Sequence, residues 1–364
     1  MKYSIIVPVF NRPDEVDELL QSLTHQTLRD FEVLIVEDGS QVRCEDVVGR
    51  YAQQLDVRYF EKPNSGPGQS RNYGAERARG QYLIVLDSDV VLPEGYLSEV
   101  DKELTDRPCE AFGGPDRAHE SFTPVQKAIN YSMTSFFTTG GIRGGKKKGA
   151  LDKFYPRSFN MGIQKSLYDR LGGFSRMRFG EDIDFSIRIF KSGARCRLFP
   201  EAWVWHKRRT DFRKFFRQVH NSGIARINLY KRHPDSLKLV HLLPAVFTVG
   251  VAALSAVFLT GLVFLILGLC SAYCGPTGCN MGLVVSYFGA ALMGLALLPL
   301  LLYALVILID SSLQNRSLRV GLLSIPASFI QLLGYGSGFL RAWWLRCVLG
   351  RNEELQAFKK TFYK

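Results

Sequence analysis

The N-terminal part of the chain alternates between short apolar runs and segments whose apolar residues recur at helical spacing. The runs expected to be strands lie at residues 3–9, 31–36, 57–60 and 81–86, and the expected helices at 13–26 and 64–79. Strands that alternate with helices at this interval form a mostly parallel sheet with helices on both faces. Ligands bind such sheets at the carboxyl ends of the strands. Asp38, Asp87 and Asp89 follow two of the expected strands and are candidates for such a site.

A further helix is expected to begin near residue 181. Its apolar residues are Ile183, Ile187 and Phe190, and its first turn carries the acidic residues Glu181, Asp182 and Asp184. Between Pro93 and this helix the pattern loosens, with paired glycines and the lysine run 146–148. We expect a mobile region near a site there, rather than more sheet.

The C-terminal part has the composition of a membrane protein. Residues 242–309 contain no Lys, Arg, Asp or Glu, and segments 242–269 and 282–309 are each long enough for a tilted span. The connection 271–280 has no positive charge, which places it outside and both ends inside. Segment 320–340 contains Pro326 and Gln331 and has positive charge at both ends. This favours a re-entrant or interfacial pair of helices over a third span.

Basic residues flank the apolar block instead of covering a globular face. Residues 203–241 carry ten basic and two acidic residues, so the net charge of +12 lies mostly outside residues 1–202. This distribution fits anionic lipid headgroups. Nucleic-acid binding is excluded because no zinc ligands, arginine-rich arm or aromatic RNA-binding motif accompanies the charge. Phe212, Phe215, Phe216 and Val219 share a helical face, which favours a helix in the membrane interface over one packed on the domain.

The sequence therefore divides into a catalytic domain at 1–202, interfacial helices at 203–241, two spans at 242–309 and a C-terminal region at 310–364. Unpaired cysteines in the first domain and the lack of a signal peptide favour a reducing, cytoplasmic compartment. Cys274 and Cys279 in the external loop are candidates for a small disulfide. Cys270 could compete for it, or all three could stay reduced.

Asp87 and Asp89 stand two apart at the end of an expected strand, so their side chains point the same way. Such a pair can hold Mg²⁺ or Mn²⁺ and leave coordination positions for a diphosphate. The string Asp-Ser-Asp-Val also matches the nucleophile strand of haloacid-dehalogenase-like phosphatases. That motif normally ends the first strand of its domain, whereas two or three expected strands precede it here.

Five motifs occur together in one order: IIVPVFNR at 5–12, LIVEDGS at 34–40, GPGQSRNYG at 66–74, LDSD at 86–89 and GEDID at 180–184. With them the chain closely resembles glycosyltransferase family 2, the inverting enzymes of GT-A fold, over residues 1–235. This resemblance implies an α/β nucleotide-sugar-binding domain, here followed by membrane helices.

The resemblance also implies roles at the donor site. Asp38 would bind the base of the nucleotide sugar beside the backbone of Pro8 and Val9, and Arg71 would approach the nucleotide and its phosphates. Asp89 would be the principal ligand of a divalent metal, Mg²⁺ or Mn²⁺. Asp87 would assist it, and Ser88 lies between them in the nucleotide-sugar-binding motif.

At the acceptor side, Asp182 matches the general base of the family. Glu181 beside it, together with Arg157 and Asn160 in the segment 155–161, are acceptor-site candidates. His206 could supply an imidazole to the metal or the diphosphate, or could be a surface residue beside the basic run 207–209.

One departure from part of the family narrows the expected function. Processive polysaccharide synthases carry Gln-x-x-Arg-Trp, whereas Gln218 is followed by Val219, His220, Asn221 and Ser222. The expected reaction is transfer of one sugar, from a UDP-sugar, to a lipid-linked acceptor at the cytoplasmic face of the cell membrane. The alternatives are a polyprenyl-phosphate glycosyltransferase and, in another class, an inactive nucleotide-sugar-binding scaffold. An inactive scaffold is disfavoured because the chain retains four acidic residues expected in the active enzyme: Asp38, Asp87, Asp89 and Asp182.

Overall fold

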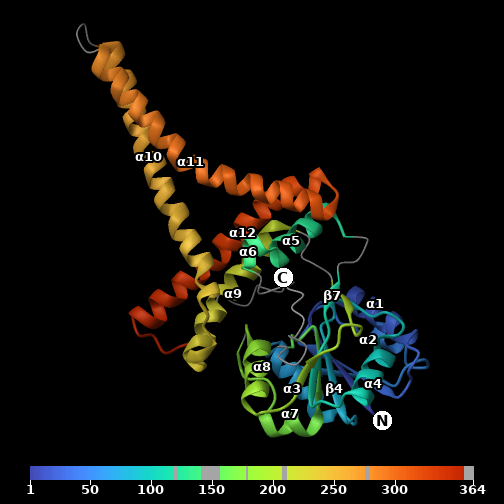
Figure 1. Ribbon diagram of the computed structural model, residues 1–364. Coiled ribbons are helices and arrows are strands. Elements are labelled where there is room, and N and C mark those ends of the chain that lie inside the picture. Colours follow the sequence, from blue (N-terminus) through green and yellow to red (C-terminus); the bar gives the residue numbers. More distant parts are fainter. Residues whose placement is uncertain (118–121, 141–155, 178, 207–210, 275–278, 356–364) are drawn as a thin grey trace.

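The computed structural model describes residues 1–117, 122–140, 156–177, 179–206, 211–274 and 279–355. An α/β domain forms the N-terminal part, and long helices of the C-terminal part extend away from it (Figure 1).

A seven-stranded sheet organises the α/β domain, in the order β3-β2-β1-β4-β8-β6-β9. Its strands are β1 (Tyr3–Val9), β2 (Phe31–Asp38), β3 (Val57–Lys62), β4 (Tyr82–Leu86), β6 (Ala111–Gly113), β8 (Asn160–Gln164) and β9 (Cys196–Leu198). The first four strands are parallel, and β8 runs antiparallel to both β4 and β6. Every residue of β2 is buried, as expected for a strand covered on both faces.

Helices cover both faces of this sheet, as the alternating pattern predicts. The apolar core on one face includes residues of α1 (Pro13–Thr24), α2 (Glu45–Gly49) and α4 (Tyr96–Asp106). The core on the other face includes residues of α3 (Pro67–Arg77), α7 (Lys165–Leu171) and α8 (Glu181–Lys191). The expected α/β fold with a mostly parallel sheet is confirmed.

A second, three-stranded sheet brings distant segments together. It consists of β5 (Val90–Val91), β10 (Val204–His206) and β7 (Asp116–Arg117), in the order β5-β10-β7. The antiparallel pairing of β10 with β5 sets His206 opposite Val90. His206 therefore lies beside the residue that precedes β5, Asp89.

The expectation of no further sheet between Pro93 and the helix near residue 181 is wrong, because β6 and β8 join the main sheet. The two strands are short and contain glycine, which hides their pattern. Glycine is required at 162, since a Cβ there would lie 1.9 Å from the ring of Phe112. The region also forms α5 (Pro124–Thr134) and α6 (Phe136–Thr139), while the lysine run 146–148 falls outside the described residues.

The helix α9 (Phe212–Arg232) lies between the α/β domain and the C-terminal helices. Part of the apolar face that we expected in the membrane interface is covered by protein: Phe215 and Val219 are buried against Ile129 and Met133 of α5, with Ile330 beside them. Phe216 on the same face is 39% exposed. The alternative, a helix packed on the rest of the protein, therefore describes Phe215 and Val219. Their apolar partner is α5, which the local sequence pattern could not reveal. Short 3-10 turns at Pro234–Ser236 and Leu239–His241 lead onward.

Three helices of the described chain are long and apolar enough to cross a membrane. Two of them, α10 (Leu243–Cys274) and α11 (Cys279–Asn315), pack together and project away from the body (Figure 1). The loop 275–278 and the side chains of Cys274 and Cys279, and with them the expected disulfide, lie outside the described residues.

The third helix, α12 (Leu318–Trp343), is continuous and ends in a π-helical turn at Trp344–Val348. The segment is therefore one helix and not the expected pair, so an interfacial helix and a third span are the arrangements that fit it. Pro326 lies inside the helix without ending it. Protein covers 39% of its most apolar window, against 6% and 11% for the other two candidate spans.

The crossing of α9 over α12 is unusually close. A Cβ at Gly338 would lie 2.0 Å from the carbonyl oxygen of His220, and one at Gly223 would lie 2.1 Å from that of Tyr335. The Nδ1 atom of His220 also lies 3.0 Å from the hydroxyl of Ser337. Because both positions are glycine, the backbones of α9 and α12 come into van der Waals contact, and the two helices pack closely.

Candidate functional site

A cavity of about 280 Å³ lies at the carboxyl ends of β1, β2 and β4. It is lined by the predicted donor-site residues Pro8, Val9, Asp38, Arg71, Asp87, Ser88 and Asp89, and by Glu181, which we expected at the acceptor side. The structure thus brings together residues from five motifs that are far apart in the sequence. We call this cavity the donor pocket.

Asp87, Asp89 and His206 form a cluster whose ligand atoms all lie within 4.8 Å of one another. The Nε2 atom of His206 lies 3.1 Å from Oδ1 of Asp89, and its ring stacks on Phe159 with centroids 4.9 Å apart. Carboxylate oxygens with one imidazole suit Mg²⁺ or Mn²⁺. The three residues fit the divalent metal that the sequence predicts.

Arg71 is buried between two carboxylates of the site. Its guanidinium donates to Asp87 and to Glu181, each over 2.8 Å, and lies 5.2 Å from the ring centre of Phe174. Burial alone would lower the pKa of Arg71, but Asp87 and Glu181 outweigh it and raise the pKa. Arg71 therefore stays charged and links the metal cluster to the start of α8.

Glu181 and Asp182, adjacent in the first turn of α8, have pKa values shifted in opposite directions. Burial, and then the charge of Asp182, raise the pKa of Glu181 to about 7, against the pull of Arg71. Burial also opposes ionisation of Asp182, but Arg157 and Arg71 outweigh it and lower its pKa. Oδ2 of Asp182 accepts a hydrogen bond from Nε of Arg157 over 2.9 Å. Asp182 is therefore ionised at neutral pH.

Asp38 fixes the loop that leads into α3. Its carboxylate accepts hydrogen bonds from the backbone of Ser65 over 2.9 Å and of Gly66 over 2.8 Å, and pairs with Lys62. The side chain lines the donor pocket although these contacts bury most of it. Asp38 thus orders the pocket wall beside Pro8 and Val9.

Asn160 has a structural position in β8. Its Oδ1 accepts from the hydroxyl of Tyr96 over 2.7 Å and its Nδ2 donates to the carbonyl of Ala202 over 2.8 Å. The residue is only 1% exposed. These contacts leave no surface for an acceptor, so the structure does not support the acceptor role expected for Asn160.

Several pocket residues were not predicted. Glu15 of α1 accepts from the hydroxyl of Ser88 over 3.2 Å, and burial together with the charge of Asp89 raises its pKa. Gln218 and Ser222 reach the same pocket from α9. Their spacing of four along the helix is the only local signal, and it does not say which surface they face.

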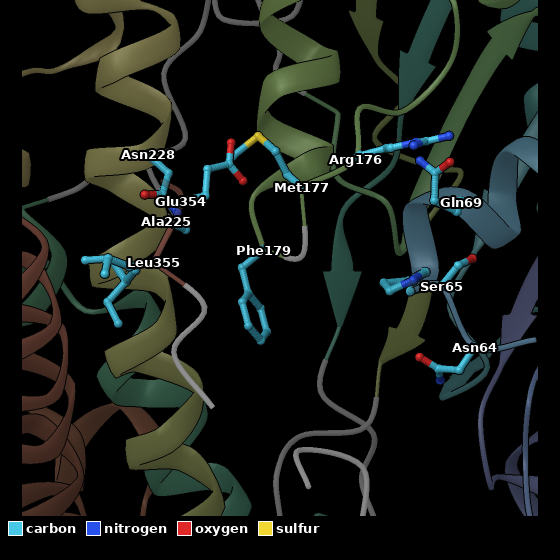
Figure 2. Close-up of a pocket in the computed structure, with 13 residues that line it drawn as sticks. Asn64, Ser65, Gln69, Arg176, Met177, Phe179, Ala225, Asn228, Glu354 and Leu355 are labelled. Atoms are coloured by element: carbon cyan, nitrogen blue, oxygen red, sulfur yellow. The ribbon is translucent and has the colours of Figure 1, made fainter. Parts of the chain in front are cut away.

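A second cavity of about 420 Å³ adjoins the donor pocket and shares Pro67 and Phe179 with it. Figure 2 shows its opposite walls: Asn64 and Ser65 before α3 on one side, and Asn228 of α9 with Glu354 and Leu355 of the tail on the other. Arg232 pairs with Glu354 over 2.6 Å and thereby holds the tail against α9.

The mostly parallel sheet, with the carboxylate and imidazole cluster at its strand ends, has the arrangement of a GT-A fold. Residues 4–172 match the family model "Glycosyl transferase family 2", and this part of the chain is a domain of that family.

Two relatives illustrate the likeness. The chain is 32% identical over 194 residues to an uncharacterized glycosyltransferase of Haemophilus influenzae, covering 52% of this chain and 62% of that protein. It is 30% identical over 240 residues to the pre-mycofactocin glycosyltransferase of Mycobacterium tuberculosis, covering 64% of this chain and 48% of that protein. Both matches span less than two thirds of the relative's length.

A solved mannosyltransferase from Pyrobaculum calidifontis, in complex with GDP-mannose and Mn²⁺, shares the fold with a TM-score of 0.55. The likeness covers 95% of this chain and 88% of that one at 15% sequence identity. It therefore includes the C-terminal helices as well as the α/β domain.

Proposed function

We propose that this protein transfers a single sugar, with inversion, from a nucleotide sugar to a lipid-linked acceptor at the cytoplasmic face of the cell membrane. The observation that carries the proposal is one pocket lined by Asp87, Asp89 and Glu181, beside helices long enough to span a bilayer. His206 clusters with the two aspartates, and Asp182 follows Glu181 at the start of α8. The product would serve assembly of a cell-surface polysaccharide or glycolipid.

The donor is a UDP-sugar in this proposal. Pro8, Val9, Asp38, Arg71 and Ser88 all line the pocket. In this proposal the first three would face the base of the nucleotide, and Arg71 with Ser88 would face the diphosphate. The nucleotide sugar and Mn²⁺ in the Pyrobaculum calidifontis enzyme support this class of donor and cofactor. A divalent ion held by Asp87, Asp89 and His206 would neutralise the leaving diphosphate.

The acceptor hydroxyl loses its proton to Asp182. Arg157 keeps that carboxylate charged before the acceptor arrives, and Arg71 holds Glu181 close by. The acceptor oxygen attacks the anomeric carbon from the side opposite the leaving diphosphate, so one displacement inverts the configuration. No second carboxylate is needed to protonate the leaving group, in contrast to glycoside hydrolysis.

The membrane attachment favours a lipid-linked acceptor. The pocket residues Gln218 and Ser222 belong to α9, which is itself packed on α12. The catalytic residues are thereby held beside helices suited to a bilayer. The basic residues that flank the apolar segments keep the catalytic domain on the cytoplasmic side and fit anionic lipids.

Purified protein in vesicles, incubated with labelled UDP-sugars and Mn²⁺, tests the proposal. One set of vesicles contains a preformed lipid-linked glycan, and a matched set contains only polyprenyl phosphate. We expect label on the glycan. Label on polyprenyl phosphate alone would instead identify a polyprenyl-phosphate glycosyltransferase, and no label with any nucleotide sugar would contradict the proposal.

A further inference from the structure

The first turn of α8, which carries Glu181 and Asp182, lies directly against α9. A Cβ placed on Gly180 would lie 3.3 Å from Cδ1 of Leu229 and 3.4 Å from Cβ of Ala225. Gly180 also has a φ of +83°, a conformation that favours glycine. The catalytic helix therefore begins at a contact with the helix that joins the α/β domain to the C-terminal helices.

One polar contact crosses this junction into the first turn. His233, the residue that follows α9, places its Nε2 atom 2.9 Å from Oδ1 of Asp184. The other carboxylate oxygen of Asp184 accepts from Nε of Arg188 over 3.0 Å. Asp184 is 2% exposed, so both partners bond a carboxylate that water hardly reaches. Hydrogen bonds to a buried carboxylate are strong and directional.

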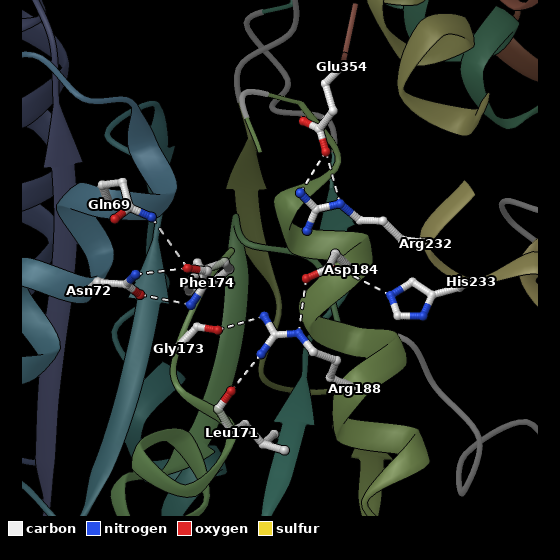
Figure 3. Close-up of polar contacts among 10 residues, drawn as sticks. All are labelled: Gln69, Asn72, Leu171, Gly173, Phe174, Asp184, Arg188, Arg232, His233 and Glu354. Atoms are coloured by element: carbon white, nitrogen blue, oxygen red, sulfur yellow. Dashed lines mark hydrogen bonds and ion pairs between the residues drawn. The ribbon is translucent and has the colours of Figure 1, made fainter. Parts of the chain in front are cut away.

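A chain of hydrogen bonds continues from Asp184 through Arg188 and the segment 171–174 to Asn72 of α3 (Figure 3). Arg188 donates to the carbonyls of Leu171 over 2.7 Å and Gly173 over 2.6 Å. The next residue, Phe174, exchanges two backbone hydrogen bonds with the side chain of Asn72 of α3, over 2.8 and 2.9 Å. Asn72 follows Arg71, whose guanidinium lies against the Phe174 ring.

We propose that His233 is a positioning residue, which holds the first turn of α8, and with it Asp182, in register with Arg71 and the metal cluster. This inference rests on the proposed function, because it assigns His233 a task in the same transfer reaction. Asp184 lies two residues after Asp182 in one helical turn, so a displacement of Asp184 moves the base. The docking of α9 thereby sets the geometry of the proton acceptor.

The core of the domain does not depend on this contact. Phe185 and Ile189 hold α8 on the sheet, where they are fully buried in the apolar core on that face. Loss of the imidazole should therefore loosen the first turn and leave the fold intact. Small misplacements of catalytic groups cost up to about 100-fold in rate, so an effect on turnover is expected.

The test compares three variants of the full chain in vesicles. His233→Ala removes the donor, and His233→Gln keeps an N–H near the position of Nε2. Lys191→Ala is the matched control, because Lys191 pairs with Asp235 over 3.0 Å at the same junction but on its exposed side. The measurements are kcat and KM for the nucleotide sugar, and amide hydrogen exchange of residues 181–185.

We expect His233→Ala to lower kcat by about 10-fold to 100-fold with KM for the donor unchanged, and to speed amide exchange in the first turn of α8. His233→Gln should restore most of both, and Lys191→Ala should match the wild type. Unchanged exchange in His233→Ala would overturn the inference, as would a Gln variant no better than Ala. Absence of transfer by the wild type would count against the proposed function, and the exchange result would still decide the role of His233.

Discussion

The guanidinium of Arg157 donates to the carboxylate of Asp182 over 2.9 Å, although the two residues come from different elements of the domain. The contact favours the charged form of Asp182, whose pKa is lowered despite burial. In the proposed mechanism, an acceptor hydroxyl would take the place of the arginine at this carboxylate. Arg157 is 38% exposed at its side chain, so it can give way to an incoming acceptor.

Substitution of the base should separate binding from chemistry. Asp182→Asn keeps the size of the side chain but cannot take the proton, so transfer should fall by about 100-fold to 10,000-fold while nucleotide binding persists. Calorimetric titration with UDP and initial rates of sugar transfer measure the two quantities. Asp169→Asn, an exposed carboxylate on α7, is the control. An active Asp182→Asn enzyme would move the role to Glu181 or Asp184.

Metal dependence should follow the cluster of Asp87, Asp89 and His206. Asp89→Ala should reduce transfer by at least about 100-fold, since it removes the principal ligand. His206→Ala should raise the Mn²⁺ concentration needed for half-maximal rate, because one of the three donors is lost. His25→Ala, on the exposed end of α1, serves as control. Full turnover in the presence of a chelator would exclude a metal-dependent reaction.

Glu181 should make stability depend on pH. Its pKa rises from 4.5 to about 7 on folding, so between these values the folded chain binds more protons than the unfolded chain. Its contribution to the free energy of unfolding therefore falls as pH rises through this window. Glu181→Gln does not titrate at this position, so the difference in melting temperature, variant minus wild type, should increase as pH rises from about 5 to about 8. Parallel melting curves that keep a constant offset across this range would refute the assigned pKa.

The topology can be tested with single cysteines in a cysteine-free chain. Cys270 lies near the far end of α10, and Leu349→Cys places an exposed thiol after α12. A membrane-impermeant thiol reagent added to intact cells should label position 270 and spare position 349, because the basic residues after α12 favour the inside. Labelling of position 349 from outside would make α12 a third span.

Local pattern was sufficient for most of the α/β domain. The predicted strand at 3–9 is β1 (Tyr3–Val9), and the predicted helix near 181 is α8 (Glu181–Lys191), because burial on the sheet imposes a clear period on both. It failed for β6 and β8, whose short, glycine-containing strands are recognisable only once Phe112 packs over Gly162. Short strands are specified by their neighbours more than by their own residues.

In the candidate site, too, the sequence motifs predicted some residues, and others could be found only from the packing of the helices. The motifs placed Asp38, Asp87 and Asp89 at strand ends, where the structure has them lining one pocket. The sequence did not predict that Gln218 and Ser222 line the donor pocket, because only the packing of α9 across the domain brings them to it. Pro326 indicated a broken helix, yet it occurs in a continuous one, α12. The helices α9 and α5 pack against α12, and Gly338 is needed for the close crossing.

The wall that α9 contributes to the donor pocket has a consequence for how this protein can be divided. A fragment ending at residue 202, the limit that the sequence suggests for the catalytic domain, would keep every aspartate of the site but lose Gln218, Ser222 and the cover over Gly180. Its pocket would be open to water along one side. The helix α9 therefore belongs both to the donor pocket and to the part that packs on the membrane helices. A fragment cut before α9 to remove the membrane helices would also lose one wall of the donor pocket.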